Sequence, residues 1–542
     1  MGNSESQKII LPGPQKKVIQ AAKTSKDHDK KKPKGSISLD DGADKDLSNL
    51  NKLDLSARVI DPADFSFPFE NLVFESGRLK CIAFCGALEY LELVGCLSNI
   101  KRVAGTGYGA MVSLLVAVGF SWQEISEMLG VDIASVTKGG LFGGGGLLSG
   151  VLRGLGVTSY GDDINNKLGR WLKEKCGDQD ITFQQIFEKY KKELCIVVTN
   201  VNLMCIDYFH VKTTPNLPVR TAVQMSLTIP GAYIPKLEPV NGIEYLYVHG
   251  GVLCTYPVHC FDGWFLSMNP ENRLIQKLFP LNDSVVDKKI KFKQFNDKTL
   301  GFSVYSNNEE DMMRSKLESR LGVLIPPRPS EETDLYKLRT ETAKLKLEIE
   351  KSYITICEAV DKFKRILDEN QFNDLELLDK KYLKESFQDE SAFTPEDIVS
   401  VFGKSVKLEV FFERLDHQGT GMVVYDELIQ KVESHGVDVG NKLRAVNKKQ
   451  TTNFISYMTI LQSTISQNTR TDYIEANDVD RTVGINTGHI ETEDNDLHPK
   501  DKQFLIDRGY NSTRAFLQYY VAKNKCSKRS TTITQSIIED TS

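Results

Sequence analysis

The feature that most constrains the fold is a run of strand-like and helix-like segments that alternate from about Phe67. Apolar runs such as NLVFES and LCIVVTNV have the length of buried strands, whereas IAFCGALEYLELVGCL has the spacing of an apolar helix face. Strands that alternate with helices favour a mostly parallel sheet with helices on both faces. The sequence therefore predicts a three-layer α/β/α fold.

Charge and cysteine content argue against several classes of protein. The chain has 68 basic and 73 acidic residues, whereas a nucleic-acid binder is usually strongly basic. Its ten cysteines form no CxxC pair and no zinc-like cluster, which favours a reducing compartment. The longest apolar run, residues 110–120, is too short to span a bilayer. We therefore expect a cytoplasmic protein that binds no nucleic acid.

The N-terminus predicts attachment to a membrane. The sequence MGNSES places Gly2 after Met1 and Ser6 at the position favoured for N-myristoylation. Residues 16–34 contain eight Lys and two Asp, a net charge of +6 that would attract an anionic leaflet. Because one acyl chain binds weakly, lipid and basic segment together form a two-part anchor. We expect residues 1–66 to be a disordered arm, N-myristoylated at Gly2, on the anionic cytosolic leaflet; a solvated lysine-rich tail is the alternative.

Several motifs, in the same order, resemble those of the patatin-like phospholipases. FESGRLKCIAFCGALEYLE resembles the oxyanion segment and its helix, and AGTGYGAMVSLLVAVGFSWQEISEML resembles the nucleophile elbow. AVQMSLTIPGAYIPKL and YLYVHGGVLCTYPV resemble the loop and strand that deliver the dyad aspartate. FNDKTLGFSV and the run from DRTVGINTG to RGYNSTRAFL also match. The resemblance implies a patatin-like domain over residues 67–328 and 452–524, in a family of lipid acyl hydrolases with a Ser–Asp dyad.

The same resemblance implies that the catalytic residues are replaced. The Gly-x-Ser-x-Gly elbow reads GTGYG here, with Gly107 at its centre, and glycine accepts the strained turn but carries no nucleophile. The family's Asp-Gly-Gly reads HGG, and its glycine-rich oxyanion segment reads SGRLKC. The degenerate positions are therefore Gly107 and His249 for the dyad, and Ser76, Gly77, Arg78, Lys80 and Cys81 for the oxyanion segment.

Residues 329–451 interrupt the resemblance and predict a helical insertion. From Leu335 a heptad pattern keeps most a and d positions apolar, which predicts a helix of about 30 residues. That helix is expected to be one arm of a hairpin, the favoured interpretation, or a coiled coil that binds a partner. The insertion is therefore the predicted site for a protein partner.

The segment VFFERLDHQGTGMVVYDELIQKV within the insertion resembles an EF-hand. A twelve-residue loop would run from Asp416 to Glu427. The predicted calcium ligands are Asp416, Gln418, Thr420, the Met422 carbonyl and Glu427. Gln418 replaces an acidic ligand and Val424 supplies no oxygen, so weak calcium binding or none is expected. Calcium is thus a candidate cofactor, and none is required.

Two further segments carry expectations. Residues 138–156 hold seven glycines between 139 and 150, which predicts either a flexible cap whose apolar side chains contact a bilayer or an ordinary packed loop. Residues 525–542 are expected to form a disordered tail.

These features predict a catalytically inactive patatin-like protein, peripheral to a membrane, that binds lipid or a protein partner. An active acyl hydrolase that uses His249 or Cys81 is the alternative. A purely structural subunit with no lipid role is a third interpretation. Turnover by the purified protein would identify the active hydrolase. Lipid binding would separate the inactive lipid-binding protein from the purely structural subunit.

Overall fold

The structure is a computed structural model of the 542-residue chain. It describes residues 60–129, 156–158, 160–233, 235, 237–240, 242–273, 275, 288–309, 317, 327–369, 377–403, 406–430, 432–433, 451, 454–469, 474–494 and 496–529. The predicted lipidation site Gly2, the basic segment 16–34, most of the glycine-rich stretch and residues 530–542 lie outside the described residues.

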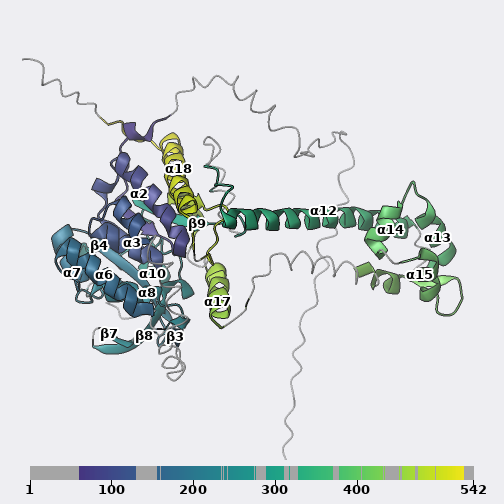
Figure 1. Cartoon of the computed structure of the whole chain (residues 1–542), viewed down its shortest axis with the longest axis horizontal. Helices are drawn as coiled ribbons and strands as arrows, with labels where there is room; N and C mark the ends of the chain where they lie inside the picture. The colour runs from purple at the N-terminus through teal and green to yellow at the C-terminus, as the bar shows by residue number, and fades with distance from the viewer. Residues whose placement is uncertain are drawn as a thin grey trace, which may run out of the picture. The chain divides into compact units, whose positions relative to one another are not determined.

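The elements follow the order expected from the alternating pattern (Figure 1). The strands are β1 (Asn71–Phe74), β2 (Arg102–Thr106), β3 (Gly156–Thr158), β4 (Glu193–Asn200), β5 (Cys205–His210), β6 (Gly231–Tyr233), β7 (Leu237–Val240), β8 (Ile243–His249), β9 (Thr299–Tyr305), β10 (Leu377–Asp379), β11 (Met422–Val424) and β12 (Thr482–Asn486). The helices are α2 (Ala83–Leu93), α3 (Tyr108–Ala117), α6 (Tyr160–Cys176), α7 (Phe183–Tyr190), α8 (Val219–Leu227), α10 (Lys288–Lys291), α12 (Asp334–Glu369), α13 (Lys380–Gln388), α14 (Pro395–Phe402), α15 (Leu408–Leu415), α17 (Phe454–Thr469) and α18 (Pro499–Lys523).

The main sheet has eight strands and is mostly parallel. Strands β12, β9, β1, β2 and β4 lie side by side in that order, and each neighbouring pair is parallel. Beyond them the sheet becomes antiparallel, because β5 and β8 both run opposite to β4, and β7 pairs with β8. The predicted α/β fold with a mostly parallel sheet is confirmed.

The register on β4 explains why two distant strand ends meet. Thr106, the last residue of β2, pairs with Val197 of β4. His249, the last residue of β8, pairs with the next residue, Val198. Since β5 occupies the other edge of β4 over these residues, β2 and β8 share one edge. The end of β2 and the end of β8 are therefore brought together.

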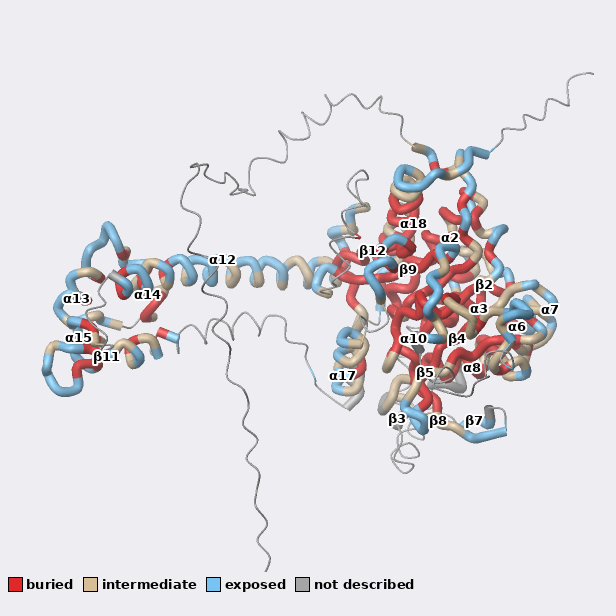
Figure 2. The backbone as a smooth tube through the Cα atoms, turned by 180° about the vertical axis from the view of Figure 1, so that it is seen from behind, coloured by how far each residue is buried: buried red, intermediate tan, exposed pale blue. Residues whose placement is uncertain are grey.

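The two faces of the sheet have different cores. Side chains such as Leu72, Phe74 and Ile196 pack with α2, α3, α8 and α18 in the largest apolar cluster. Alternate side chains, among them Val73 and Val197, pack against the irregular segment 254–266. Figure 2 shows the buried residues concentrated in these strands and their covering helices. The period-two alternation of strand side chains thus builds both cores.

Helices α2 and α18 cross in close contact, although more than 400 residues separate them in sequence (Figure 1). A Cβ atom at Gly86 of α2 would lie 1.8 Å from the backbone oxygen of Ile506. A Cβ atom at Gly509 of α18 would lie 1.8 Å from the oxygen of Ala83. Only glycine permits this backbone approach.

The insertion contains a second apolar core. The end of α12 packs with α13, α14 and α15 around Phe363, Phe387 and Phe412. Strands β10 and β11 form a short antiparallel pair in which Leu378 faces Val423. Residues 341–358 of α12 are mostly solvent exposed, and the described residues include no helix packed along them (Figure 2). The hairpin therefore stays a prediction.

Candidate functional site

The turn after β2 has the geometry expected of an elbow. Gly107 joins β2 directly to α3 with φ 57° and ψ −122°, a conformation that favours glycine. Its N–H donates to Ser226 Oγ at 2.8 Å, and that hydroxyl donates to the carbonyl oxygen of Val197 at 2.7 Å. Ser226 therefore ties the turn to β4. The AVQMSLTIP segment contains this serine, but the sequence pattern gave no sign of its role.

His249 is held at the same place by the end of α8. Its backbone N–H donates to the oxygen of Thr228 at 2.7 Å, and its ring Nδ1 lies 2.5 Å from the carbonyl oxygen of Ser226. A carbonyl only accepts, so Nδ1 carries the proton and Nε2 the lone pair. Burial lowers the pKa of His249 to about 4, and the positive charge of Arg78 adds to this. The imidazole is therefore neutral at pH 7.

The space beside Gly107 is already filled. A Cβ atom at residue 107 would lie 2.5 Å from His249 Cε1 and 2.5 Å from Ser76 Oγ. Nonbonded atoms do not approach this closely, so either the side chains of His249 and Ser76 or the turn itself would have to move. Gly107, His249 and Ser76, three of the positions predicted from the sequence, thus meet in one place.

The degenerate oxyanion segment is bound tightly to its surroundings. The Ser76 N–H donates to the oxygen of Thr255 at 3.0 Å. A Cβ atom at Gly77 would lie 2.5 Å from Val304 Cγ2. Arg78 has φ 51°, a conformation that is uncommon for a residue with a side chain. The Ser76 amide is therefore already used within the protein.

Cys81 is the last predicted position of this segment. Its side chain is fully buried, and its thiol lies 3.7 Å from the carbonyl oxygen of Glu75. Burial raises the pKa of the Cys81 thiol well above its ordinary value. A nucleophilic cysteine needs the thiolate, which is disfavoured here.

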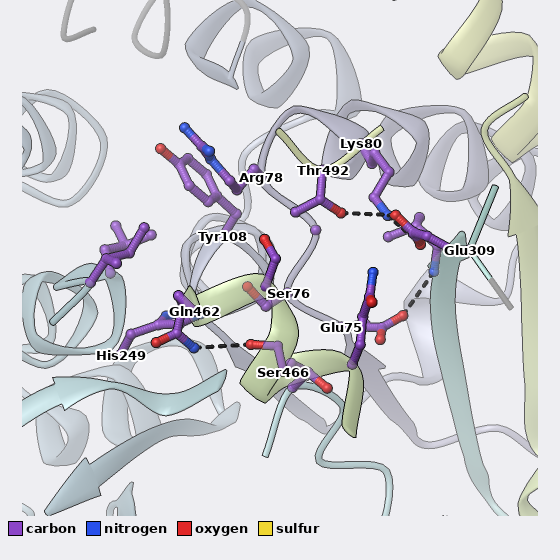
Figure 3. A pocket seen from close by; sticks show the side chains of 17 residues that line it. Glu75, Ser76, Arg78, Lys80, Tyr108, His249, Glu309, Gln462, Ser466 and Thr492 are labelled. Carbon is purple, nitrogen blue, oxygen red and sulfur yellow. Dashed lines mark hydrogen bonds and ion pairs between the residues drawn. The ribbon is translucent and has the colours of Figure 1, made fainter. Parts of the chain in front are cut away.

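A small cavity of about 80 Å³ lies between these residues (Figure 3). Lys80 lines it but is paired, because its Nζ donates to Glu309 Oε1 at 2.7 Å and to Oε2 at 2.8 Å. Thr492 Oγ1 also donates to Glu309, at 3.0 Å. The remaining lining residues are Glu75, Ser76, Gly77, Arg78, Tyr108, Leu227, Ile229, His249, Thr255, Val304, Gln462, Ser463, Ser466 and Gln467. Most of these residues have polar side chains, although apolar atoms form the larger part of the cavity wall.

Helix α17 closes one side of the cavity, and the sequence motifs did not predict this. Gln462 and Ser466 point toward the cavity in Figure 3 and are joined by a hydrogen bond of 2.9 Å. Ser466 Oγ also donates to the carbonyl oxygen of Gly251 at 2.8 Å, two residues beyond His249. The helix follows the insertion in sequence, so only the tertiary structure places it at the site.

The five predicted calcium ligands lie in the insertion, and two of them are in contact, because the Thr420 N–H donates to Asp416 Oδ1 at 2.9 Å. Asp416 is buried, whereas Gln418 and Thr420 are exposed. Glu427 Oε2 lies 3.3 Å from His417 Nε2. In the part of the chain that the structure describes, no three acidic, histidine or cysteine side chains are grouped for a metal ion. Only Asp416 and Glu427 of the five predicted ligands belong to these residue types, so calcium binding by this loop stays a prediction.

Comparison with known proteins agrees with the fold of the main domain. Residues 72–272 match the model of the patatin-like phospholipase family. An uncharacterized protein R571 of Acanthamoeba polyphaga mimivirus is 29% identical over 195 residues, which are 36% of this chain and 61% of that protein. A probable lipid hydrolase 463L of Invertebrate iridescent virus 6 is 24% identical over 35% of this chain and 62% of its own length. The chain thus spans about three fifths of the length of these relatives.

Solved structures give a more distant resemblance. VipD from Legionella pneumophila is 14% identical, with a TM-score of 0.34 over 87% of this chain and 73% of its own. ExoU from Pseudomonas aeruginosa, in complex with SpcU, is 15% identical with a TM-score of 0.25 over 74% of this chain and 85% of its own. TM-scores of this size do not establish a shared arrangement of the whole chain. The family match and the α/β fold together show that residues 72–272 are similar in sequence and fold to the patatin-like phospholipases.

Proposed function

We propose that this protein is a catalytically inactive patatin-like protein that works at a membrane surface by binding a lipid or a protein partner. The observation that carries the proposal is the filled space at the elbow. Residue 107 has no hydroxyl, and His249 and Ser76 occupy the room that a side chain there would need. Loss of a serine nucleophile typically lowers kcat by about 10⁶-fold.

The remaining nucleophile candidates are poorly suited to the chemistry. Cys81 is buried and its raised thiol pKa disfavours the thiolate. His249 has a lone pair on Nε2, but no hydroxyl at residue 107 for it to activate. The Ser76 amide, a candidate oxyanion donor, already binds Thr255. These features favour an inactive site over an altered hydrolase.

The cavity supports a surface role over the storage of an acyl chain. Its volume of about 80 Å³ leaves room for a few water molecules, whereas pockets for drug-sized ligands are about 300–1,000 Å³. Among the described residues, no helix is long and apolar enough to cross a bilayer. We therefore assign membrane attachment to N-myristoylation at Gly2 with the basic segment 16–34, and partner binding to residues 329–451.

The inactivity is tested by esterase and phospholipase assays of the purified protein. We expect no turnover, and turnover by the unmodified protein would overturn the proposal. The double variant Gly107→Ser, His249→Asp is expected to stay inactive, because the new Cβ atom at residue 107 would still collide with Ser76 Oγ. Adding Ser76→Gly removes that collision, so any regained activity should appear only in the triple variant. His249→Asp alone is the matched control.

The membrane role is tested by co-flotation with vesicles that contain phosphatidylserine, using protein co-expressed with an N-myristoyltransferase. We expect the full chain to float, and Gly2→Ala or neutralisation of the lysines in 16–34 to reduce binding at least about tenfold, because either change leaves a single weak anchor. Flotation that is unaffected by both changes would rule out this anchor.

A further inference from the structure

The loop 416–427 contains a charged contact that its resemblance to a calcium site does not explain. Lys380 Nζ lies 2.6 Å from Asp416 Oδ2. The Asp416 side chain is 1% exposed and also accepts the N–H of Thr420 at 2.9 Å and of Gly421 at 3.0 Å. Both oxygens of the first predicted ligand are therefore bound from within the chain. The Lys380 ammonium holds the pKa of Asp416 down at about 2, with these amides assisting.

The backbone fixes Lys380 in this position. Asp379 of β10 pairs with Met422 of β11, and the Lys380 N–H donates to the oxygen of Gly421 at 2.9 Å. Lys380 is also the first residue of α13. Its side chain therefore starts beside the loop and reaches the Asp416 carboxylate as a result of strand register. Lys380 Nζ also lies 3.1 Å from Glu413 Oε2 in α15, so one ammonium joins α13, α15 and the loop.

The far end of the loop is also contacted from within the chain. In an EF-hand, the glutamate at the last position closes the shell around the ion with both carboxylate oxygens. Here Glu427 Oε2 lies 3.3 Å from His417 Nε2. The last predicted ligand therefore also has a polar contact within the loop.

We propose that the Lys380 ammonium takes the place of a divalent cation at Asp416, so that the helical module of residues 377–430 holds its shape without calcium. An ammonium supplies a compact positive charge and three donors, which satisfy the Asp416 carboxylate that a calcium ion would otherwise bind. The module is then permanently available to a partner and is not switched by calcium. Because Lys380 and two backbone amides already bind Asp416, a calcium ion would have to displace the ammonium. This inference does not depend on the lipid role of the main domain.

The test is hydrogen–deuterium exchange of the full chain, with the exchange of residues 416–427 compared in millimolar calcium and in excess chelator. We expect the two curves of the unmodified protein to coincide. Lys380→Met removes the charge and keeps the aliphatic stem, and exchange in the loop should accelerate roughly tenfold or more. Lys381→Met, at a neighbouring residue that is 87% exposed, should change nothing. Lys380→Arg keeps the charge and should preserve most of the protection.

Three results would overturn the proposal. The first is slower exchange of the loop on adding calcium to the unmodified protein, abolished by Glu427→Gln. The second is a Lys380→Met loop that exchanges like that of Lys381→Met. The third comes from Asp416→Asn, which breaks the same ion pair from the loop side. If Lys380 and Asp416 act on each other, the loop of the Lys380→Met, Asp416→Asn double variant exchanges no faster than the loop of the faster single variant. Additive effects on the exchange rate would mean that the two residues act separately, and would overturn the proposal.

Discussion

Gly107 has no side chain, so the elbow carries no nucleophile at this position. Its φ of 57° and the 2.5 Å approach of His249 and Ser76 to its absent Cβ atom both favour glycine. We expect Gly107→Ala to lower the free energy of unfolding by about 2–5 kcal/mol, from backbone strain and overpacking together. Urea unfolding measures this.

Gly119→Ala is the matched control for that substitution. Gly119 also has a positive φ, 83°, but nothing lies within 4 Å of its Cβ position. It should therefore show only the strain component. Equal losses in the two variants would mean that the space beside Gly107 is not filled in solution. Ser76→Gly added to Gly107→Ala should recover part of the loss.

His249 gives the site a dependence on pH. Its pKa is about 4 in the folded protein because it is buried, and about 6.5 when unfolded. As pH falls from about 6.5 to 4, the unfolded chain takes up a proton that the folded protein does not. The free energy of unfolding should therefore drop by about 3 kcal/mol over this range, with no further loss from this residue below pH 4.

Urea unfolding at several pH values between 4 and 7.5 checks this, with His249→Asn as the comparison. Buried His210, whose pKa is also lowered by burial, is retained in both proteins. The difference between the two pH profiles therefore reports His249 alone. Parallel profiles would contradict the prediction.

At the scale of elements, the crossing of α2 and α18 depends on two glycines. A Cβ atom at Gly509 would lie 1.8 Å from the oxygen of Ala83, which is backbone and cannot rotate away. We expect Gly509→Ala to destabilise the protein by about 3 kcal/mol, measured by thermal or urea unfolding. In an unhindered helix the same exchange stabilises by about 0.5–1 kcal/mol.

Gly169→Ala is the control, because we expect it not to destabilise the protein. Gly169 lies in α6, and the nearest atom to its Cβ position is the end of the flexible Arg220 side chain at 3.3 Å. This variant should be neutral or slightly stabilising. If Gly509→Ala behaves in the same way, the two helices do not cross as closely as described.

At the scale of the whole molecule, a buried ion cluster joins segments on either side of the insertion. Arg481 precedes β12, and both of its terminal nitrogens lie 2.6 Å from the Asp262 carboxylate. It also contacts Asp478 at 2.6 Å. Arg481→Met would leave two buried carboxylates without their cation, so we expect a loss of about 3–5 kcal/mol in the free energy of unfolding.

Lys523→Met is the control for a pair outside the core. Lys523 Nζ lies 2.8 Å from Asp480, with both side chains about half exposed. Solvent screening makes such pairs worth about 0–1 kcal/mol, so the variant should be nearly as stable as the unmodified protein. A similar loss in both variants would mean that the Arg481 cluster is not buried in solution.

Local sequence patterns predict the alternating elements and the mostly parallel sheet, because strand and helix periodicity encode them. The meeting of residues 107 and 249 was implied only by the resemblance to the patatin-like family. The heptad pattern also placed the long helix near Leu335. Predictions for Gly2 and residues 16–34 stay predictions. The alternating elements and the long helix depend on residues close together in the sequence, which is why a sequence pattern could indicate them.

The side chains that surround the site come from distant segments and are known only from the three-dimensional packing. Ser76 Oγ occupies the position where a side chain of residue 107 would lie. Glu309 binds Lys80, and α17, which follows the insertion in sequence, covers one side of the cavity. In the insertion, strand register brings Lys380 to Asp416 from 36 residues away. Such contacts depend on packing between distant segments. The charge and spacing of residues along the chain do not indicate which distant residue a buried group contacts.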